Sequence, residues 1–203
     1  MSNDRVASFN DLGIISSLIE STHICAGNIA KQAAAGETFE NQNYKPVMTN
    51  FLPHFKDGTF ETAFPEIVDY VDATFNTKAD KAHRAIAGLS MGGLHSVMIS
   101  ANYPDLFDYV GLFSAGVNFK DIDMEAFPAY ANLDTKLATQ AKKGVKLYWI
   151  AIGKEDQHMN NNKLLMERLD KDGLKYTYHE SSRGHIWSNW RQYTLQFVPQ
   201  LFK

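Results

Sequence analysis

Residues 84–93 read RAIAGLSMGG and decide the fold, because a short apolar strand passes through a Gly-x-Ser-x-Gly turn into a helix. Apolar side chains recur at helical spacing after the turn, up to a stop before Pro104. A serine in such a turn is strained with its hydroxyl exposed, and the flanking glycines avoid backbone collisions. We therefore expect Ser90 to be a nucleophile, with the N–H of Met91 at the positive end of the helix as an oxyanion donor.

Apolar runs of strand length alternate with amphipathic stretches on both sides of this turn. This pattern predicts about five parallel strands covered by helices on both faces, a three-layer α/β fold. The strands are expected at residues 47–51, 84–89, 109–113, 145–152 and 174–178. One helix is expected from near Phe64, where Pro65 favours a start, to Phe75, and a second after Ser90. A third is expected from a cap at Asn160 to Gly173, and a fourth after His185.

The composition limits the number of domains and the kinds of partner. We predict one domain over residues 44–203, preceded by a segment, residues 1–43, whose structure the sequence does not indicate. The net charge of -3 and the scattered Lys and Arg residues argue against a nucleic-acid partner. Cys25 is the single cysteine, and without a Cys/His cluster we expect no structural metal and no cofactor. No export signal or bilayer-length apolar run is evident, which favours a soluble chain, cytoplasmic as given.

The general base is sought among seven histidines. In a parallel α/β sheet, functional side chains gather beyond the carboxyl ends of the strands, and a serine nucleophile needs a base there. His185 follows the last predicted strand in an Arg-Gly-His turn and is our candidate. The others precede Ser90, lie on the helix after it, adjoin the acid candidate or fall within a strand: His23, His54, His83, His95, His158 and His179.

The acid is expected in residues 153–156, GKED, directly after a strong predicted strand. We favour Asp156 over Glu155, although either carboxylate could instead cap a helix or lie in a solvated loop. The acid would hold the tautomer of His185 and stabilise its imidazolium form. Trp187 and Trp190 could line an acyl pocket or anchor the last helix, and the sequence leaves both roles open.

Three stretches carry a resemblance to a known family: residues 84–93, residues 147–156 and residues 184–191, GHIWSNWR. Together they resemble the esterase D-like α/β-hydrolases, especially the feruloyl and acetylxylan esterases of carbohydrate esterase family one in gut Bacteroidetes, over about residues 44–203. The resemblance implies a triad of Ser90, Asp156 and His185 without a metal or cofactor. It also implies small-molecule or polysaccharide-linked ester substrates, often feruloyl or acetyl groups of xylan, and a secreted or periplasmic location.

The sequence departs from that family in its first forty residues. Relatives carry early strands and a His-Gly loop that donates the second oxyanion N–H, and residues 23–27, HICAG, match that loop too loosely. We therefore expect an N-terminally truncated or altered α/β-hydrolase fold with weak turnover of unactivated esters. The competing hypothesis is a catalytically weak or vestigial binding domain, which a fluorophosphonate probe would leave unlabelled. The sequence does not indicate an oligomeric state.

Overall fold

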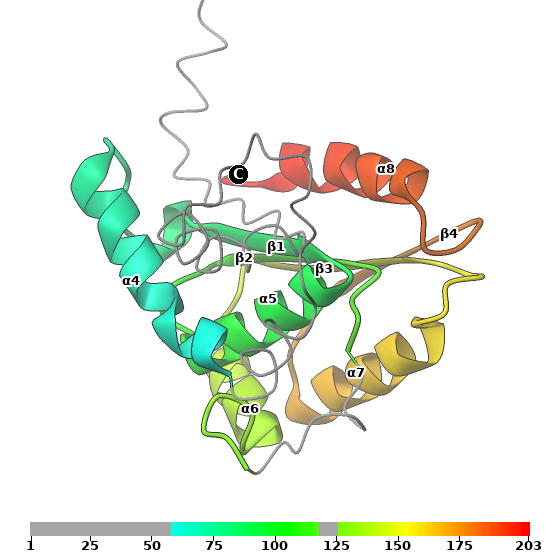
Figure 1. Ribbon diagram of the computed structural model, residues 1–203, viewed down its shortest axis with the longest axis horizontal. Helices are drawn as coiled ribbons and strands as arrows, with labels where there is room; N and C mark the ends of the chain where they lie inside the picture. Colours follow the sequence, from blue (N-terminus) through cyan, green and yellow to red (C-terminus); the bar gives the residue numbers. More distant parts are fainter. Residues whose placement is uncertain (1–57, 118–125) are drawn as a thin grey trace, which may run out of the picture.

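Helices and strands alternate along residues 58–117 and 126–203, the parts of the chain that the computed structural model describes (Figure 1). Short 3₁₀ turns cover Lys81–His83 and Val198–Gln200. The longer elements are α4 (Thr59–Thr74), β1 (Ala85–Leu89), α5 (Met91–Asn102), β2 (Tyr109–Phe113), α6 (Leu133–Lys143), β3 (Leu147–Gly153), α7 (Met159–Asp172), β4 (Thr177–Ser181) and α8 (Trp187–Phe197).

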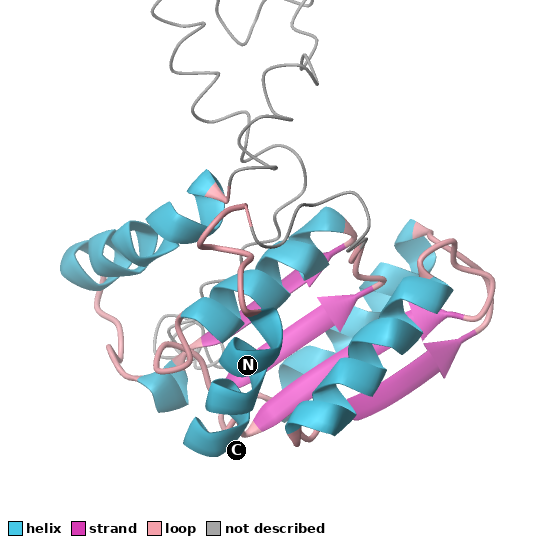
Figure 2. Cartoon of the chain, turned by 90° about the horizontal axis from the view of Figure 1, so that it is seen from below, coloured by secondary structure: helices cyan, strands magenta, loops and turns pink. Residues whose placement is uncertain are grey.

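The four strands form one parallel sheet in the order β1-β2-β3-β4. Helix α8 covers one face, and α5, α6 and α7 lie on the other, as Figures 1 and 2 show. This arrangement confirms the predicted three-layer α/β architecture. The strand predicted at residues 47–51 and the segment 1–43 lie outside the described residues, so the division of the chain into these two parts stays a prediction.

Alternating strand residues supply the two apolar layers of the core. Side chains such as Ile86, Leu112 and Ile150 pack under α5, α6 and α7. Their neighbours along the strands, such as Phe113 and Trp149, pack with α8 on the opposite face. The period of two is what a sheet covered on both faces requires. Because the strands pair in parallel, the carboxyl ends of all four lie at one edge of the sheet.

The start of α4 differs from the prediction. The helix begins at Thr59 rather than near Phe64, because both the N–H and the hydroxyl of Thr62 donate to the Gly58 carbonyl, at 3.0 and 2.9 Å. Pro65 costs one internal hydrogen bond, and the burial of Phe64 offsets that loss. Ile67 of this helix and Phe75 directly after it are exposed.

Two further boundaries were predicted wrongly. Asn160 is not the cap of α7, which begins one residue earlier at Met159 with His158 as its N-cap residue. The last strand begins at Thr177 rather than Leu174, because the N–H of Leu174 donates to the Leu169 carbonyl and so completes the turn that ends α7 at the left-handed Gly173. The other predicted strands of the described residues and the helix after His185 are confirmed to within a few residues.

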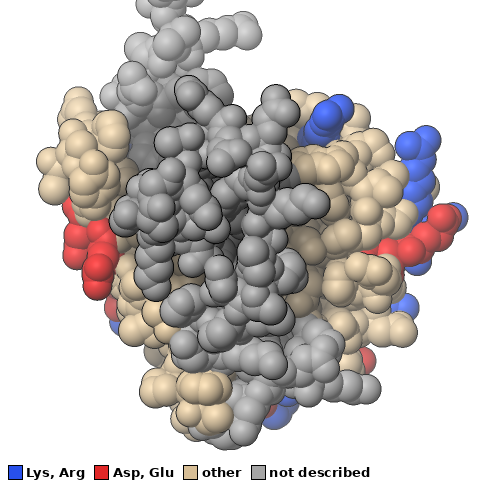
Figure 3. Space-filling view, viewed as in Figure 1, with Lys and Arg blue, Asp and Glu red and all other residues tan. Residues whose placement is uncertain are grey.

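Charged side chains of both signs lie around the rim of the face drawn in Figure 3, without gathering into one basic patch among the atoms described there. None of the described helices is both long and apolar enough to cross a membrane. No group of three His, Cys, Asp or Glu side chains within residues 58–117 and 126–203 is arranged to hold a metal ion.

Candidate active site

Ser90 occupies a sharp turn between β1 and α5. Its backbone angles, φ 52° and ψ -117°, are conformations that glycine adopts far more readily than a residue with a side chain. Four backbone hydrogen bonds hold it there: the Ser90 N–H donates to Phe113 O at 2.9 Å, and its carbonyl accepts from Gly93 N at 3.0 Å, Leu94 N at 3.4 Å and Gly116 N at 2.6 Å. These bonds therefore hold the strained turn and keep the Ser90 side chain at the carboxyl end of β1.

The glycines of the motif are required by close contacts between backbones. A Cβ atom on Gly88 would lie 2.2 Å from the carbonyl carbon and oxygen of Gly92. A Cβ atom on Gly93 would lie 2.6 Å from the Cβ of Ala115. Helix α5 can therefore approach β1 and the loop after β2 this closely only with glycine at both positions.

A continuous hydrogen-bonded chain links three side chains that are far apart in the sequence. Nε2 of His185 lies 3.0 Å from the Ser90 hydroxyl oxygen. Nδ1 of His185 lies 3.0 and 3.2 Å from the two carboxylate oxygens of Asp156. The three residues follow β1, β4 and β3, so the parallel sheet brings together at its carboxyl edge the trio that the sequence predicted.

Asp156 and its neighbour Glu155 have different surroundings. Asp156 is 5% exposed and accepts a hydrogen bond from the His158 N–H at 2.9 Å. The side chain of Glu155 is exposed, and its backbone N–H donates to the Arg183 carbonyl at 3.0 Å. Asp156 is therefore the carboxylate beside the histidine, whereas Glu155 joins the loops through its backbone.

A second histidine lies beside the first. The rings of His158 and His185 meet edge to face with their centroids 5.0 Å apart. Partial burial lowers the pKa of His158, and the nearby His185 lowers it further, against the opposing effect of the Asp156 carboxylate. The sequence placed His158 beside the acid but did not indicate that the two imidazoles would be in contact, because that depends on how the two loops fold.

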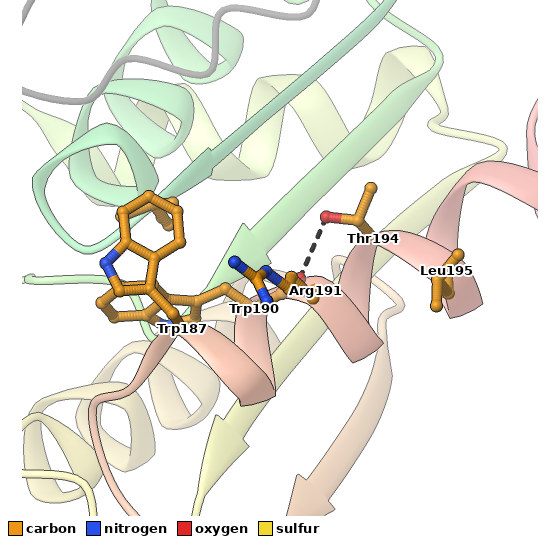
Figure 4. A pocket seen from close by; sticks show the side chains of 6 residues that line it. Trp187, Trp190, Arg191, Thr194 and Leu195 are labelled. Carbon is orange, nitrogen blue, oxygen red and sulfur yellow. Dashed lines mark hydrogen bonds between the residues drawn. The ribbon is translucent and has the colours of Figure 1, made fainter.

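The two tryptophans, whose roles the sequence left open, differ in burial. Trp190 is buried, and its ring lies edge to face against His185 with centroids 4.8 Å apart, so it anchors α8 beside the histidine. Trp187 is 52% exposed and contacts Trp190 at a centroid distance of 5.1 Å. It forms one wall of a mainly apolar groove of about 440 Å³ along α8 (Figure 4), lined also by Leu89, Trp190, Arg191, Thr194 and Leu195.

The candidate oxyanion donor lies next to the serine. Met91 is the first residue of α5, so its N–H has no partner within the helix and lies at the positive end of the helix dipole. A Cβ atom on Gly116 would come 3.4 Å from this nitrogen, so the glycine keeps the space beside it open. Residues 1–43, in which the sequence shows no clear family-type loop for a second donor, lie outside the described residues.

The chain is similar to known proteins in both sequence and structure. The family model described as "Putative esterase" matches residues 28–201. An endo-1,4-beta-xylanase/feruloyl esterase of Xylanibacter ruminicola is 30% identical over 139 residues, 68% of this chain and 17% of that protein. An acetyl esterase of Caldicellulosiruptor saccharolyticus is 26% identical over 154 residues, 63% of this chain and 58% of that protein. The chain thus spans less than two thirds of the length of either relative.

A solved structure with the same fold is the S-formylglutathione hydrolase of Staphylococcus aureus. It superimposes with a TM-score of 0.63 at 20% sequence identity, over 76% of this chain and 65% of that protein. At this identity the likeness concerns the fold alone. It confirms the expected α/β-hydrolase architecture of the described sheet and helices.

Proposed function

Because the chain belongs to the esterase family whose model matches residues 28–201, we propose that it is a serine carboxylic ester hydrolase that works through an acyl-enzyme. The observation that carries the proposal is the hydrogen-bonded chain from Ser90 through His185 to Asp156. A serine hydroxyl is a poor nucleophile at its own pKa, and a base within hydrogen-bond reach, itself oriented by a carboxylate, is the arrangement that activates it.

In the proposed acylation step, the Ser90 oxygen attacks the ester carbonyl carbon while its proton passes to Nε2 of His185. The carbonyl oxygen becomes an oxyanion, which the Met91 N–H stabilises at the start of α5. When the tetrahedral intermediate collapses, the bond to the alcohol oxygen breaks. His185 returns its proton to that oxygen, so the alcohol leaves neutral and the acyl group stays on Ser90.

Water completes the cycle by the same route. His185 removes a proton from the water, whose oxygen attacks the acyl-enzyme carbonyl, and the proton then returns to the Ser90 oxygen as the acid leaves. Asp156 keeps a proton on Nδ1 of His185, so that Nε2 can accept, and it stabilises the imidazolium formed in each step. The burial of Asp156 strengthens this interaction.

We propose feruloyl or acetyl esters of plant polysaccharide as the substrates. The two curated relatives support this choice, since their names are those of a xylanase/feruloyl esterase and an acetyl esterase. The apolar groove beside Trp187 supports the aromatic acyl group, because a flat ring can pack against the exposed indole. Such a substrate would be met outside the cytoplasm, and we propose a secreted or periplasmic site of action.

Two measurements test the activity. A fluorophosphonate probe should label the wild-type protein and fail to label Ser90→Ala, while His179→Ala, which alters a histidine of β4 outside the trio, should label normally. Turnover should then be followed with the nitrophenyl esters of acetate, butyrate and ferulate and with methyl ferulate. Absence of labelling in a folded wild-type protein would refute the activated serine and favour a binding domain.

A further inference from the structure

The loop that carries His185 has little regular structure to hold it. Residues 182–186 connect β4 to α8, and Arg183 has φ 68°, a left-handed conformation that is unfavourable for an arginine. Two backbone contacts tie the loop to the neighbouring one: Lys154 N donates to Ser181 O at 2.9 Å, and Glu155 N donates to Arg183 O at 3.0 Å. Along the chain, the Ser182 carbonyl lies between these two contacts, and the Gly184 carbonyl follows the second.

A single side chain binds both of these carbonyls. Asn189, in the first turn of α8, is 7% exposed, and its Nδ2 donates to Ser182 O and to Gly184 O, each at 3.0 Å. Because both neighbours are acceptors, the amide nitrogen faces them, and both of its hydrogens are used. The amide therefore spans the strained Arg183 and completes the hydrogen bonding of four successive carbonyls, residues 181–184.

The same amide packs against the strand that leads to the acid. A Cβ atom on Gly153, the last residue of β3, would lie 2.2 Å from the Arg183 carbonyl oxygen and 2.9 Å from Nδ2 of Asn189. Asp156 follows three residues after this glycine. The Asn189 amide thus lies where the loop of the histidine and the loop of the acid touch.

We propose that Asn189 is a positioning residue that holds His185 in line with Ser90 and Asp156. The proposal rests on the proposed hydrolase function only for its kinetic consequence, since the geometry itself can be measured without turnover. Asn189 touches neither the Ser90 oxygen nor Asp156 among the contacts of the described residues; it acts through the backbone on both sides of Arg183.

Loss of the amide should change the rate more than substrate binding. Without the two donors, the Gly184 carbonyl is left to water, the Ser182 carbonyl keeps only the Ser181 hydroxyl as a donor, at 3.1 Å, and Arg183 relaxes from its strained conformation. A catalytic group displaced by about 1 Å loses on the order of 10²-fold in rate. We expect Asn189→Ala to lower kcat by about that factor with KM changed less than about twofold, because the residue lies outside the groove.

The experiment compares three variants with a matched control. Asn189→Ala removes both donors, Asn189→Ser keeps one, and Asn189→Asp keeps the shape but turns acceptors toward two carbonyls. Gln192→Ala removes an exposed amide from the same helix. With kcat taken per titrated active site, we expect Asn189→Ser to fall between wild type and Asn189→Ala. Asn189→Asp should be at least as impaired as Asn189→Ala, and Gln192→Ala should match wild type.

A spectroscopic measurement tests the geometry directly. The downfield proton resonance of a hydrogen-bonded imidazole, assigned to Nδ1 of His185 by its absence in His185→Ala, should broaden or vanish in Asn189→Ala while the protein is still folded. Unchanged resonance and unchanged kcat in Asn189→Ala would overturn the proposal. A wild type without turnover, in which Asn189→Ala nevertheless loses the resonance, would refute the hydrolase function and support the positioning role.

Discussion

The backbone N–H of His158 donates to Oδ1 of Asp156 at 2.9 Å, which closes a tight turn in which the carboxylate binds the chain two residues ahead. This bond fixes the short aspartate side chain and leaves Oδ2 toward Nδ1 of His185, at 3.0 Å. The carboxylate is thus held by its own backbone before it meets the histidine.

The first prediction concerns this carboxylate. Asp156→Asn should lower kcat by up to about four decades, because an amide cannot hold the required tautomer or stabilise the imidazolium. Glu155→Gln should stay close to wild type, since that side chain is exposed. Steady-state hydrolysis of nitrophenyl acetate measures both, and a larger loss in Glu155→Gln than in Asp156→Asn would show that the acid is assigned wrongly.

The second prediction separates the strain of the serine turn from its chemistry. Both Ser90→Ala and Ser90→Gly should abolish hydrolysis, but only glycine accepts φ 52° and ψ -117° without strain. Glycine relieves about 1–3 kcal/mol of strain in the folded state. It also gives the unfolded chain more freedom, which costs about 0.4–1 kcal/mol of stability, so the balance favours Ser90→Gly. Urea denaturation should find Ser90→Gly more stable than Ser90→Ala by roughly 1 kcal/mol; a Ser90→Gly protein less stable than Ser90→Ala would mean that the turn is not strained.

The serine and the histidine could be predicted because each has a local signal. The Gly-x-Ser-x-Gly turn identifies Ser90, and the topology of a parallel sheet requires the base to follow a later strand at the same edge, where His185 stands. Asp156 required one more choice, between adjacent carboxylates. The structure distinguishes them by burial, which the sequence shows only indirectly.

The features that escaped prediction depend on contacts between distant segments. The amide of Asn189 reaches carbonyls of a loop whose conformation no local pattern indicates, and a polar residue in the first turn of a helix is ordinary. The start of α4 was misplaced because the low helix propensity of Pro65 argued against a helix that begins before it. The packing of Phe60 against the His95 ring, with centroids 4.8 Å apart, is a tertiary contact that no local pattern indicates.

The third prediction follows from the lowered pKa of His158. Burial is the main cause, followed by repulsion from His185. In the unfolded chain this histidine takes up a proton near its ordinary pKa of about 6.5, whereas in the folded protein it does so only at lower pH. Between these two values the unfolded state binds more protons, so the free energy of unfolding decreases as the pH falls.

When the pH is lowered from about 8 to about 5.5, the free energy of unfolding of His158→Gln should therefore decrease less than that of wild type. Urea denaturation at the two pH values measures this difference. Gln192→Ala, which removes no titratable group, is the control and should show the same decline as wild type. If His158→Gln declines as steeply as wild type, His158 does not contribute to the acid sensitivity of the fold.

The last prediction concerns acyl specificity and compares the two tryptophans. Both line the groove, but Trp187 is half exposed, whereas Trp190 is buried against the His185 ring. Removing the exposed indole should cost an aromatic acyl group about 1.5 kcal/mol of contact and leave the histidine in place. Trp187→Ala should therefore lower kcat/KM for nitrophenyl ferulate about tenfold relative to nitrophenyl acetate.

Trp190→Ala should behave differently, because it removes the support of His185 and so lowers the rates with both esters. Val198→Ala, an exposed apolar residue just beyond α8 and outside the groove, should leave both rates at the wild-type level. The ratio of the two kcat/KM values is the deciding quantity, since a general loss of folded protein cancels from it. Were Trp187→Ala to slow ferulate and acetate equally, the groove would not hold the acyl group.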